Sequence, residues 1–450
     1  MPDKVVIVGG GIAGIAAAIR LAEAGVRVVL LETRRKLGGR ATSFNDVRTG
    51  EVIDNCQHVA MGCCTNYIDL CRRLGVLDKI EWRREVHWVE AGGRTSTIRP
   101  GLLPAPGHFT GSFLGVKFLT LAEKAALARA MVAIIATDRG LHRARTFGDW
   151  LREHHQPAGV VEKFWSPVVV SACNLDVDRV CAATALHVFQ EGFLAHRDAA
   201  TVGVSRVPLL ELYDRAEEVI ASSGGELRLG QSVQSVRERA VVTVDGQTLG
   251  ADAVILAVPP ERAARLIDPA VAARDDRFAR LGEITHSPIL GVHMTFDRPV
   301  LPLHSAVLVS RPTQWVFRKD SEGRKLHAVI SAADDWVALT EDEITRRVVA
   351  DLVACFPDAR DAAVVSSRPV KEKLATFAAT PEIEAIRPAT VGESRILLAG
   401  DYVQTGWPAT MEGAARSGYM AAAAAMGRRA DDGLIDPLPH AVMYAALSSA

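Results

Sequence analysis

The first 32 residues place two apolar runs on either side of an alanine-rich stretch. Lys4 to Val8 and Arg27 to Glu32 are almost continuous Val, Ile and Leu, which is typical of strands covered on both faces of a parallel sheet. Between them, a glycine turn leads into residues 12–24, which are rich in Ala, Ile and Leu. The pattern predicts a strand, a helix and a second strand that form one βαβ unit.

Strand patterns return late in the chain. Four short apolar segments separated by glycine and charge lie at 227–229, 232–237, 241–244 and 253–257, and they fit either a second βαβ unit or a hairpin. A last buried strand at 395–399 runs into a Gly- and Ala-rich helix that begins near Met411. We therefore expect one nucleotide-binding domain assembled from three separated segments.

Two insertions of different character separate these segments. The first is mostly helical, with apolar residues at helical spacing from Leu119 to Ala136, and it predicts a helical cap. The second alternates strand-like segments with one helix and predicts a mixed sheet under a covering helix. The predicted fold is α/β, with a Rossmann-like domain in 1–94, 205–285 and 391–430, a substrate domain in 95–204 and 286–390, and a C-terminal tail in 431–450 whose last dozen residues fray.

Length and composition restrict the class of protein. The 450 residues exceed one core of ordinary size, and 52 basic against 53 acidic side chains provide no field that would recruit nucleic acid. No run of 18 uncharged apolar residues occurs, so no membrane span is predicted. The seven cysteines follow neither a disulfide nor a zinc-ligand pattern. We expect reduced thiols, no bound metal and a cytoplasmic protein.

A glycine motif lies between the first strand and the first helix. Gly9, Gly11 and Gly14 form GxGxxG, in which the first glycine permits the tight turn, the second lets a pyrophosphate approach, and the third lets helix and strand pack closely. Glu32 ends the second strand, where a carboxylate accepts hydrogen bonds from ribose hydroxyls. An ordinary glycine turn is the alternative, but the surrounding strand, helix and acid favour dinucleotide binding.

A second glycine pair, Gly38 and Gly39, precedes Arg40. The pair permits close backbone approach, and the guanidinium can form a forked contact with a phosphate; a flexible loop with a solvated arginine is the alternative. The stretch from Glu32 to Arg40 resembles that of the flavin-containing amine oxidase and phytoene desaturase superfamily. This resemblance implies FAD as cofactor and leaves NAD as the minor interpretation.

The segment after the last strand independently indicates FAD as the cofactor. Asp401 can accept hydrogen bonds from a polyol chain, and a helix that begins near Thr410 directs backbone donors at an anion. In the similar enzymes, Asp401 would hold the ribityl chain and the Met411 amide would face the pyrimidine ring. A capped helix after a strand is the alternative. The candidate cofactor-binding residues are Gly9, Gly11, Ile12, Ala13, Gly14, Glu32, Thr33, Gly39, Arg40, Val233, Gly400, Asp401, Thr410 and Met411.

The same segment narrows the resemblance. Asp401 to Arg416 is similar to the hydroxysqualene dehydroxylases of hopanoid pathways, as are Asp54 to Gly62 with Asn66, Trp165 to Pro167 with Asn174, and Val207 to Leu209 with the helix predicted over 210–221. This resemblance implies reductive removal of an allylic hydroxyl from hydroxysqualene, with FADH2 as hydride donor, to give squalene. A carotenoid-type desaturase, an amine oxidase-like flavoenzyme and a non-catalytic flavin-binding protein are the alternatives. The electron donor and the oligomeric state stay open.

Two residues are candidates for chemistry beside the flavin. His58 follows the nucleotide loops, where its alternative role is that of a core histidine, and Trp407 is a candidate wall of the substrate channel, where its alternative role is packing. No lysine can be assigned from sequence to the position beside flavin N5 that amine oxidases often fill.

A cluster of apolar residues in the helical insertion is a candidate for peripheral contact with the inner face of the cytoplasmic membrane. Its alternative is the inner face of a cap helix. The cluster comprises Leu102, Leu103, Phe109, Phe113, Leu114, Phe118 and Leu119.

Overall fold

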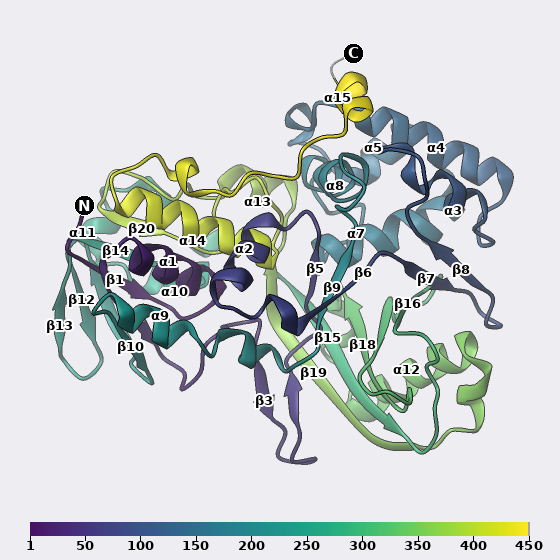
Figure 1. Cartoon of the computed structure of the whole chain (residues 1–450), viewed down its shortest axis with the longest axis horizontal. Helices are drawn as coiled ribbons and strands as arrows, with labels where there is room; N and C mark the ends of the chain where they lie inside the picture. The colour runs from purple at the N-terminus through teal and green to yellow at the C-terminus, as the bar shows by residue number, and fades with distance from the viewer. Residues whose placement is uncertain (449–450) are drawn as a thin grey trace.

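The computed structural model describes residues 1–448. Figure 1 shows two regions beside each other: helices α1 and α14 with the N-terminal strands on one side, and a large sheet with the helices of the insertion on the other. Each region contains a sheet buried by helices, which is the layered arrangement that the alternation of strands and helices predicts.

The first sheet is parallel and joins strands from distant parts of the chain. Its order is β10–β2–β1–β14–β20. The strands are β1 (Lys4–Val8), β2 (Arg27–Glu32), β10 (Glu226–Leu229), β14 (Ala253–Leu256) and β20 (Ile396–Leu398). The predicted Rossmann-like sheet from three separated segments is therefore confirmed.

Two long helices cover one face of this sheet. α1 (Ile12–Glu23) packs against α14 (Met411–Ala425), and it also contacts α9 (Ala216–Ser222). The predicted continuous helix over 210–221 is wrong, because a 3-10 helix at Leu209–Tyr213 precedes α9. The chain turns there so that Leu209, Leu212 and Tyr213 can enter the core.

The late strand cluster contains both a sheet strand and a hairpin. β11 (Val233–Arg237), β12 (Ala240–Thr243) and β13 (Thr248–Gly250) form a separate antiparallel sheet. Of the two arrangements that the sequence left open, the hairpin is the one observed for these strands, whereas β10 and β14 flank them in the parallel sheet.

The second large sheet has seven strands in the order β19–β15–β18–β17–β16–β7–β8. They are β7 (Val86–Val89), β8 (Thr95–Ile98), β15 (His286–Phe296), β16 (Ser305–Leu308), β17 (Trp315–Arg318), β18 (Lys325–Ser331) and β19 (Val364–Phe377). α12 (Glu341–Cys355) packs its buried side chains on one face. The predicted mixed sheet with a covering helix is confirmed.

The expected boundary at residue 94 cuts through one structural unit. β7 pairs with β8 in a hairpin and with β16 in parallel, so it belongs to the second sheet and not to the nucleotide-binding segment. This partner comes from more than 200 residues further along the chain, and local patterning does not show such a pairing.

The helical insertion packs around an aromatic core. Trp165 is fully buried and meets Phe147 and Phe189 edge to face at centroid distances of 5.7 and 4.9 Å. Its helices are α3 (Thr110–Leu114), α4 (Leu121–Ala136), α5 (Phe147–Glu153), α6 (Ala158–Val160), α7 (Ser166–Cys173) and α8 (Ala182–Phe189). These buried aromatic contacts provide the helical cap that the apolar pattern predicts.

The C-terminal tail differs from the expectation of fraying. α15 (Val442–Ser448) packs against α4, and its Tyr444 is buried; residues 449 and 450 lie outside the described residues. The remaining elements are α2 (Thr65–Arg73), α10 (Pro260–Leu266), α11 (Pro269–Ala272), α13 (Pro381–Ile386), β3 (Ser43–Asn45), β4 (Val52–Asp54), β5 (Val59–Met61), β6 (Ile80–Arg83) and β9 (Val202–Ser205).

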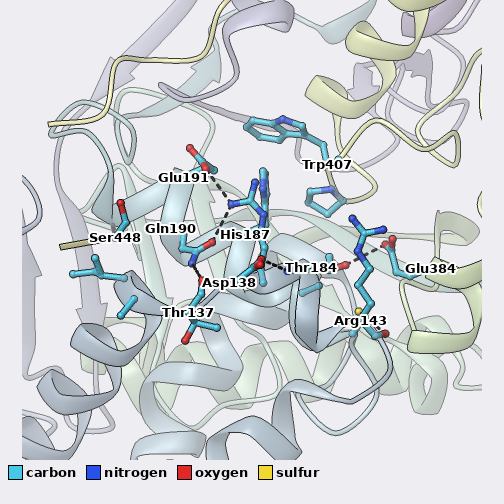
Figure 2. Close-up of a pocket in the computed structure, with 18 of the residues that line it drawn as sticks. Thr137, Asp138, Arg143, Thr184, His187, Gln190, Glu191, Glu384, Trp407 and Ser448 are labelled. Carbon is cyan, nitrogen blue, oxygen red and sulfur yellow. Dashed lines mark hydrogen bonds and ion pairs between the residues drawn. The ribbon is translucent and has the colours of Figure 1, made fainter. Parts of the chain in front are cut away.

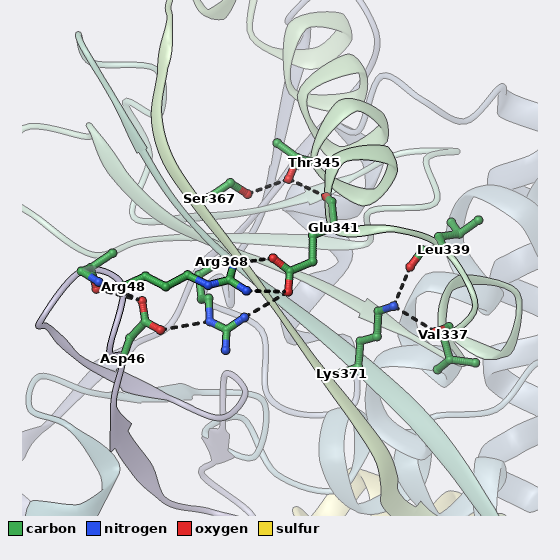
Figure 3. A network of polar contacts seen from close by, with 10 residues as sticks. Asp46, Arg48, Val337, Leu339, Glu341, Thr345, Ser367, Arg368 and Lys371 are labelled. Atoms are coloured by element: carbon green, nitrogen blue, oxygen red, sulfur yellow. Dashed lines mark hydrogen bonds and ion pairs between the residues drawn. The ribbon is translucent and has the colours of Figure 1, made fainter.

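A polar network fastens the β3–β4 hairpin to the second sheet. Arg368 of β19 donates to Asp46 at 3.1 Å and to Glu341 of α12 at 3.1 Å, and Arg48 also contacts Glu341 (Figure 3). Asp46 is buried. Burial alone would raise its pKa, but hydrogen bonds from Thr49 and the charge of Arg368 lower it.

We expect Arg368→Met to lower the free energy of unfolding by about 1 to 3 kcal/mol, because it leaves the buried Asp46 carboxylate without a cation. Urea unfolding measures the difference. Arg48→Met is the matched control, since its side chain is more than half exposed and such a pair contributes below about 1 kcal/mol. Because the pKa of Asp46 is lowered in the folded protein, its carboxylate stabilises the fold at pH values above its ordinary pKa of 3.8. The difference in unfolding free energy between the unchanged protein and Arg368→Met should therefore shrink as the pH falls through the lowered pKa.

Candidate functional site

The glycine turn after β1 is too tight for any larger residue. Gly9 has a φ of +107°, and a Cβ on Gly14 would lie 1.9 Å from the Gly9 carbonyl oxygen. Gly11 is the N-cap of α1, and no side chain caps the helix there. The first N–H groups of α1, which include those of Ile12 and Ala13, are therefore left for an anion.

Glu32 holds its carboxylate beside this turn. Its two oxygens accept hydrogen bonds from the Gly10 amide at 2.8 Å and the Arg34 amide at 2.7 Å. The Gln231 amide donates to the Glu32 carbonyl at 2.9 Å, which brings the segment that contains Val233 alongside the end of β2. The structure thus brings together Glu32 and Val233, whereas the neighbouring Thr33 is exposed.

The second glycine pair packs directly on the first turn. The Gly38 amide donates to the Gly10 carbonyl at 2.8 Å, and a Cβ on Gly39 would lie 3.0 Å from Gly11 Cα. Arg40 reaches from this loop to the buried carboxylate of Asp401, with Nη2 and Oδ1 2.5 Å apart. The two ends of the predicted site, 361 positions apart in sequence, therefore meet.

Arg387 organises the segment that contains Asp401, and sequence analysis did not find it. Its guanidinium is buried and donates to four backbone carbonyl groups and to the Glu384 carboxylate at 3.0 Å. The carbonyl groups belong to Asp401, Tyr402, Val403 and Trp407, at 2.6 to 3.2 Å. Nothing in the local pattern around Arg387 identifies this role, because the segment it holds is recognisable only once the chain is folded.

The N-terminus of α14 lies just beyond this segment. Gly400 follows β20 with a φ of +149°, and its amide donates to Ser417 of α14 at 2.8 Å. Thr410 caps the helix by accepting from the Gly413 amide at 3.0 Å. Met411 is half-buried and lines a cavity, so the predicted helix start does face an open space.

That cavity is apolar and has a volume of about 560 Å³. It extends from Gln57 and Met411 to Phe109 and Phe113 of the helical insertion, with Phe317 of the second sheet on another wall. Glu412 also lines it, but the carboxylate is committed because it accepts from the Tyr67 amide at 2.8 Å and from the Asn66 side chain at 2.8 Å. Long hydrocarbon chains fit such a lining.

The two catalytic candidates lie differently around this cavity. Trp407 lines it, whereas the residues on either side of His58, Gln57 and Val59, line it in place of His58 itself. The His58 ring is held by a contact of 3.1 Å between Nδ1 and the Cys56 carbonyl oxygen. Gln57 Oε1 is buried without a hydrogen-bond partner, so Gln57 is the polar group of this loop that is free to bind.

A second cavity of about 570 Å³ is also lined by Trp407 (Figure 2). In contrast to the first, it is lined by charged and amide groups, among them Arg139, Arg143, Glu191 and Glu384. All seven cysteines are free and buried, and residues 1–448 contain no cluster of three or more His, Cys, Asp or Glu side chains that could hold a metal ion.

Comparison with known proteins identifies the family. A family model described as flavin containing amine oxidoreductase matches residues 12–426. The chain belongs to this family. A 15-cis-phytoene desaturase of an Oncidium hybrid is 26% identical over 94% of this chain and 78% of its own. A hydroxysqualene dehydroxylase of Rhodopseudomonas palustris is 28% identical over 94% of this chain and 98% of its own.

Solved structures agree on the fold. Putrescine oxidase with bound putrescine superimposes with a TM-score of 0.70 over 95% of this chain and 99% of its own, at 19% identity. An oxidoreductase from Methanosarcina mazei gives 0.71 over 94% and 100%, at 18% identity. The predicted amine oxidase and phytoene desaturase-like fold is confirmed.

The protein is an FAD-dependent oxidoreductase of this family, and the residues of the site fit the cofactor. The uncapped start of α1 suits the pyrophosphate, Glu32 suits the ribose, and Asp401 suits the ribityl chain. The free Gln57 Oε1 and the start of α14 suit the polar edge of the ring. When bound, FAD carries two electrons and can give or take a hydride.

We expect Arg387→Met to weaken FAD retention at least about tenfold. The backbone carbonyl groups of the Asp401 segment would lose the guanidinium that donates to them and would remain buried without a partner. Flavin absorbance after extensive dialysis measures the retained fraction. Arg428→Met, at an exposed position beyond α14, is the control. Full flavin retention by Arg387→Met would show that the segment keeps its shape without the guanidinium.

Proposed function

We propose that the chain catalyses reductive dehydroxylation of hydroxysqualene to squalene. The observation that carries the proposal is the apolar cavity that begins beside Gln57 and Met411, the residues that suit the polar edge of the flavin ring, and continues to Phe109 and Phe113. The reaction replaces an allylic hydroxyl by hydride: R–OH, a hydride and a proton give R–H and water. An allylic cation is short-lived in water, so the reaction needs an apolar lining such as that of this cavity.

Similarity supports the same proposal. The hydroxysqualene dehydroxylase of Rhodopseudomonas palustris aligns over nearly the whole of both chains. Within residues 1–448, no lysine lines the apolar cavity, in agreement with the departure from amine oxidases that the sequence shows. Phytoene desaturases align as extensively on this chain, and hydride removal from a polyprenoid is therefore the second candidate.

The assay is anaerobic incubation of the holoenzyme with chemically reduced flavin and hydroxysqualene. We expect squalene to form in proportion to the enzyme added, with one reduced flavin oxidised per squalene. Incubation of oxidised enzyme with phytoene is the parallel arm. Dehydrogenated phytoene without any squalene in the first arm would replace dehydroxylation by desaturation, and no turnover of either polyprenoid would exclude both.

We also propose that the protein meets this substrate at a membrane surface. Leu102, Leu103 and Leu114 are exposed, at 100%, 53% and 62%, and they flank the Phe109 and Phe113 end of the apolar cavity. Phe118 and Leu119 are buried, as expected for the inner face of a cap helix, so the proposed membrane contact is restricted to the exposed leucines. No helix within residues 1–448 is long and apolar enough to cross a bilayer. A cytoplasmic location stays a prediction.

Replacing Leu102 and Leu114 by Asp should lower sedimentation with anionic liposomes at least about tenfold, since burial of one Leu side chain contributes about 1.5 to 3 kcal/mol. Flavin content should not change, because both side chains are exposed. Val244→Asp is the control: Val244 is 65% exposed between β12 and β13, at the opposite end of the molecule (Figure 1). Equal sedimentation of all three proteins would exclude this surface as the contact.

A further inference from the structure

His187 occupies an unusual position on α8. Its side chain is 5% exposed, and neither ring nitrogen has a hydrogen-bond partner. Two other histidines of residues 1–448, His108 and His327, share both properties, but neither lines the apolar or the polar cavity, whereas His187 lines both. A buried N–H donor without a partner is destabilising, which indicates that a ligand completes it.

The wall between the two cavities is built around this ring. Trp407 and Glu191 also line both cavities, and the Trp407 ring meets the His187 ring edge to face at 4.7 Å. α8 continues directly into a π-helical turn, Gln190–Leu194, and such turns are frequent at functional sites. His187 therefore stands at the boundary between an apolar space and a polar one.

The polar side chains near His187 form hydrogen bonds with one another and with the backbone. Arg139 donates to Gln190 Oε1 at 2.9 Å and to Glu191 Oε1 at 3.2 Å. Gln190 in turn donates to the carbonyl oxygens of Ile134 and Thr137, both at 2.8 Å. These hydrogen bonds hold the wall between the cavities in place. The imidazole of His187 takes no part in them and is left unpaired in that wall.

Burial lowers the pKa of His187 to about 3, and the positive charges of Arg139, Arg416 and Arg387 contribute to the same shift. At neutral pH the ring is therefore uncharged, with an N–H on one nitrogen and a lone pair on the other. Such a ring can donate a proton on one side while it accepts another on its opposite side.

We propose that His187 binds the hydroxyl of the substrate in the apolar cavity and relays a proton to it from water in the polar cavity. This inference rests on the proposed dehydroxylation. As the C–O bond breaks, the oxygen keeps the electron pair and takes the proton from one ring nitrogen, while the other nitrogen takes a proton from solvent water. The hydride that reduced flavin would supply bonds to the carbon, and the water that forms leaves through the polar cavity.

The first test is kinetic. His187→Phe should keep its flavin spectrum and reduce kcat for squalene formation at least about 100-fold, the lower end of general acid catalysis. His187→Ala should behave alike, but added imidazole should restore part of its activity by entering from the polar cavity. His154→Phe is the matched control, because the half-buried His154 stacks on Trp150 at 3.9 Å and lines neither cavity.

The second test measures binding and requires no turnover. Perturbation of flavin absorbance gives the affinities for hydroxysqualene and for squalene. The unchanged protein should bind the alcohol about threefold to tenfold more tightly, as one neutral hydrogen bond provides, and His187→Phe should lose this preference while it binds squalene as before.

The outcomes separate the two proposals. A protein that makes no squalene yet loses its preference for the alcohol in His187→Phe would refute dehydroxylation and retain hydroxyl recognition by His187. A protein that makes squalene equally fast with Phe at position 187, or whose Ala variant gains nothing from imidazole, would refute the relay and retain the proposed function.

Discussion

The site depends on how closely α14 approaches α1. A Cβ on Gly418 would lie 2.2 Å from the Ala13 carbonyl oxygen, so the two helices can touch there only because that residue is glycine. This contact fixes α14 over the glycine turn and places its first residues, Thr410 and Met411, beside the apolar cavity. The Arg40–Asp401 ion pair forms because the same approach brings the last segment of the chain onto the first.

Local patterns predicted the parts of the fold that local physics determines. The βαβ unit, the glycine turn, the late strands and the covering helix each bury a continuous or periodic set of apolar side chains, and the structure contains all of them. The expected boundary at residue 94 placed β7 in the nucleotide-binding segment, because its partner β16 is distant in sequence. The helix expected at 210–221 is broken because its residues enter the core from two short helices.

Sequence analysis could predict the residues of the site that belong to a cofactor-binding motif, but it could not predict the others. Arg40 and Asp401 form an ion pair, and Glu32 lies beside the glycine turn. His58 itself does not line the apolar cavity, whereas its neighbour Gln57 does, and the Gln57 side-chain oxygen has no hydrogen-bond partner. Arg387 and His187 carry no motif, and their importance comes from what distant segments place around them.

The two cavities would let a single wall meet the opposite requirements of the dehydroxylation that we propose. A carbon that carries positive charge must be kept from water, whereas the oxygen that leaves it must be given a proton and then removed. A wholly apolar site would satisfy the first requirement and trap the water that forms; a wholly polar site would let water attack the carbon. In the proposed reaction, Trp407 and His187 would divide the space so that the hydrocarbon lies on one side and solvent on the other, and a neutral imidazole would pass a proton across without placing a permanent charge on the apolar side.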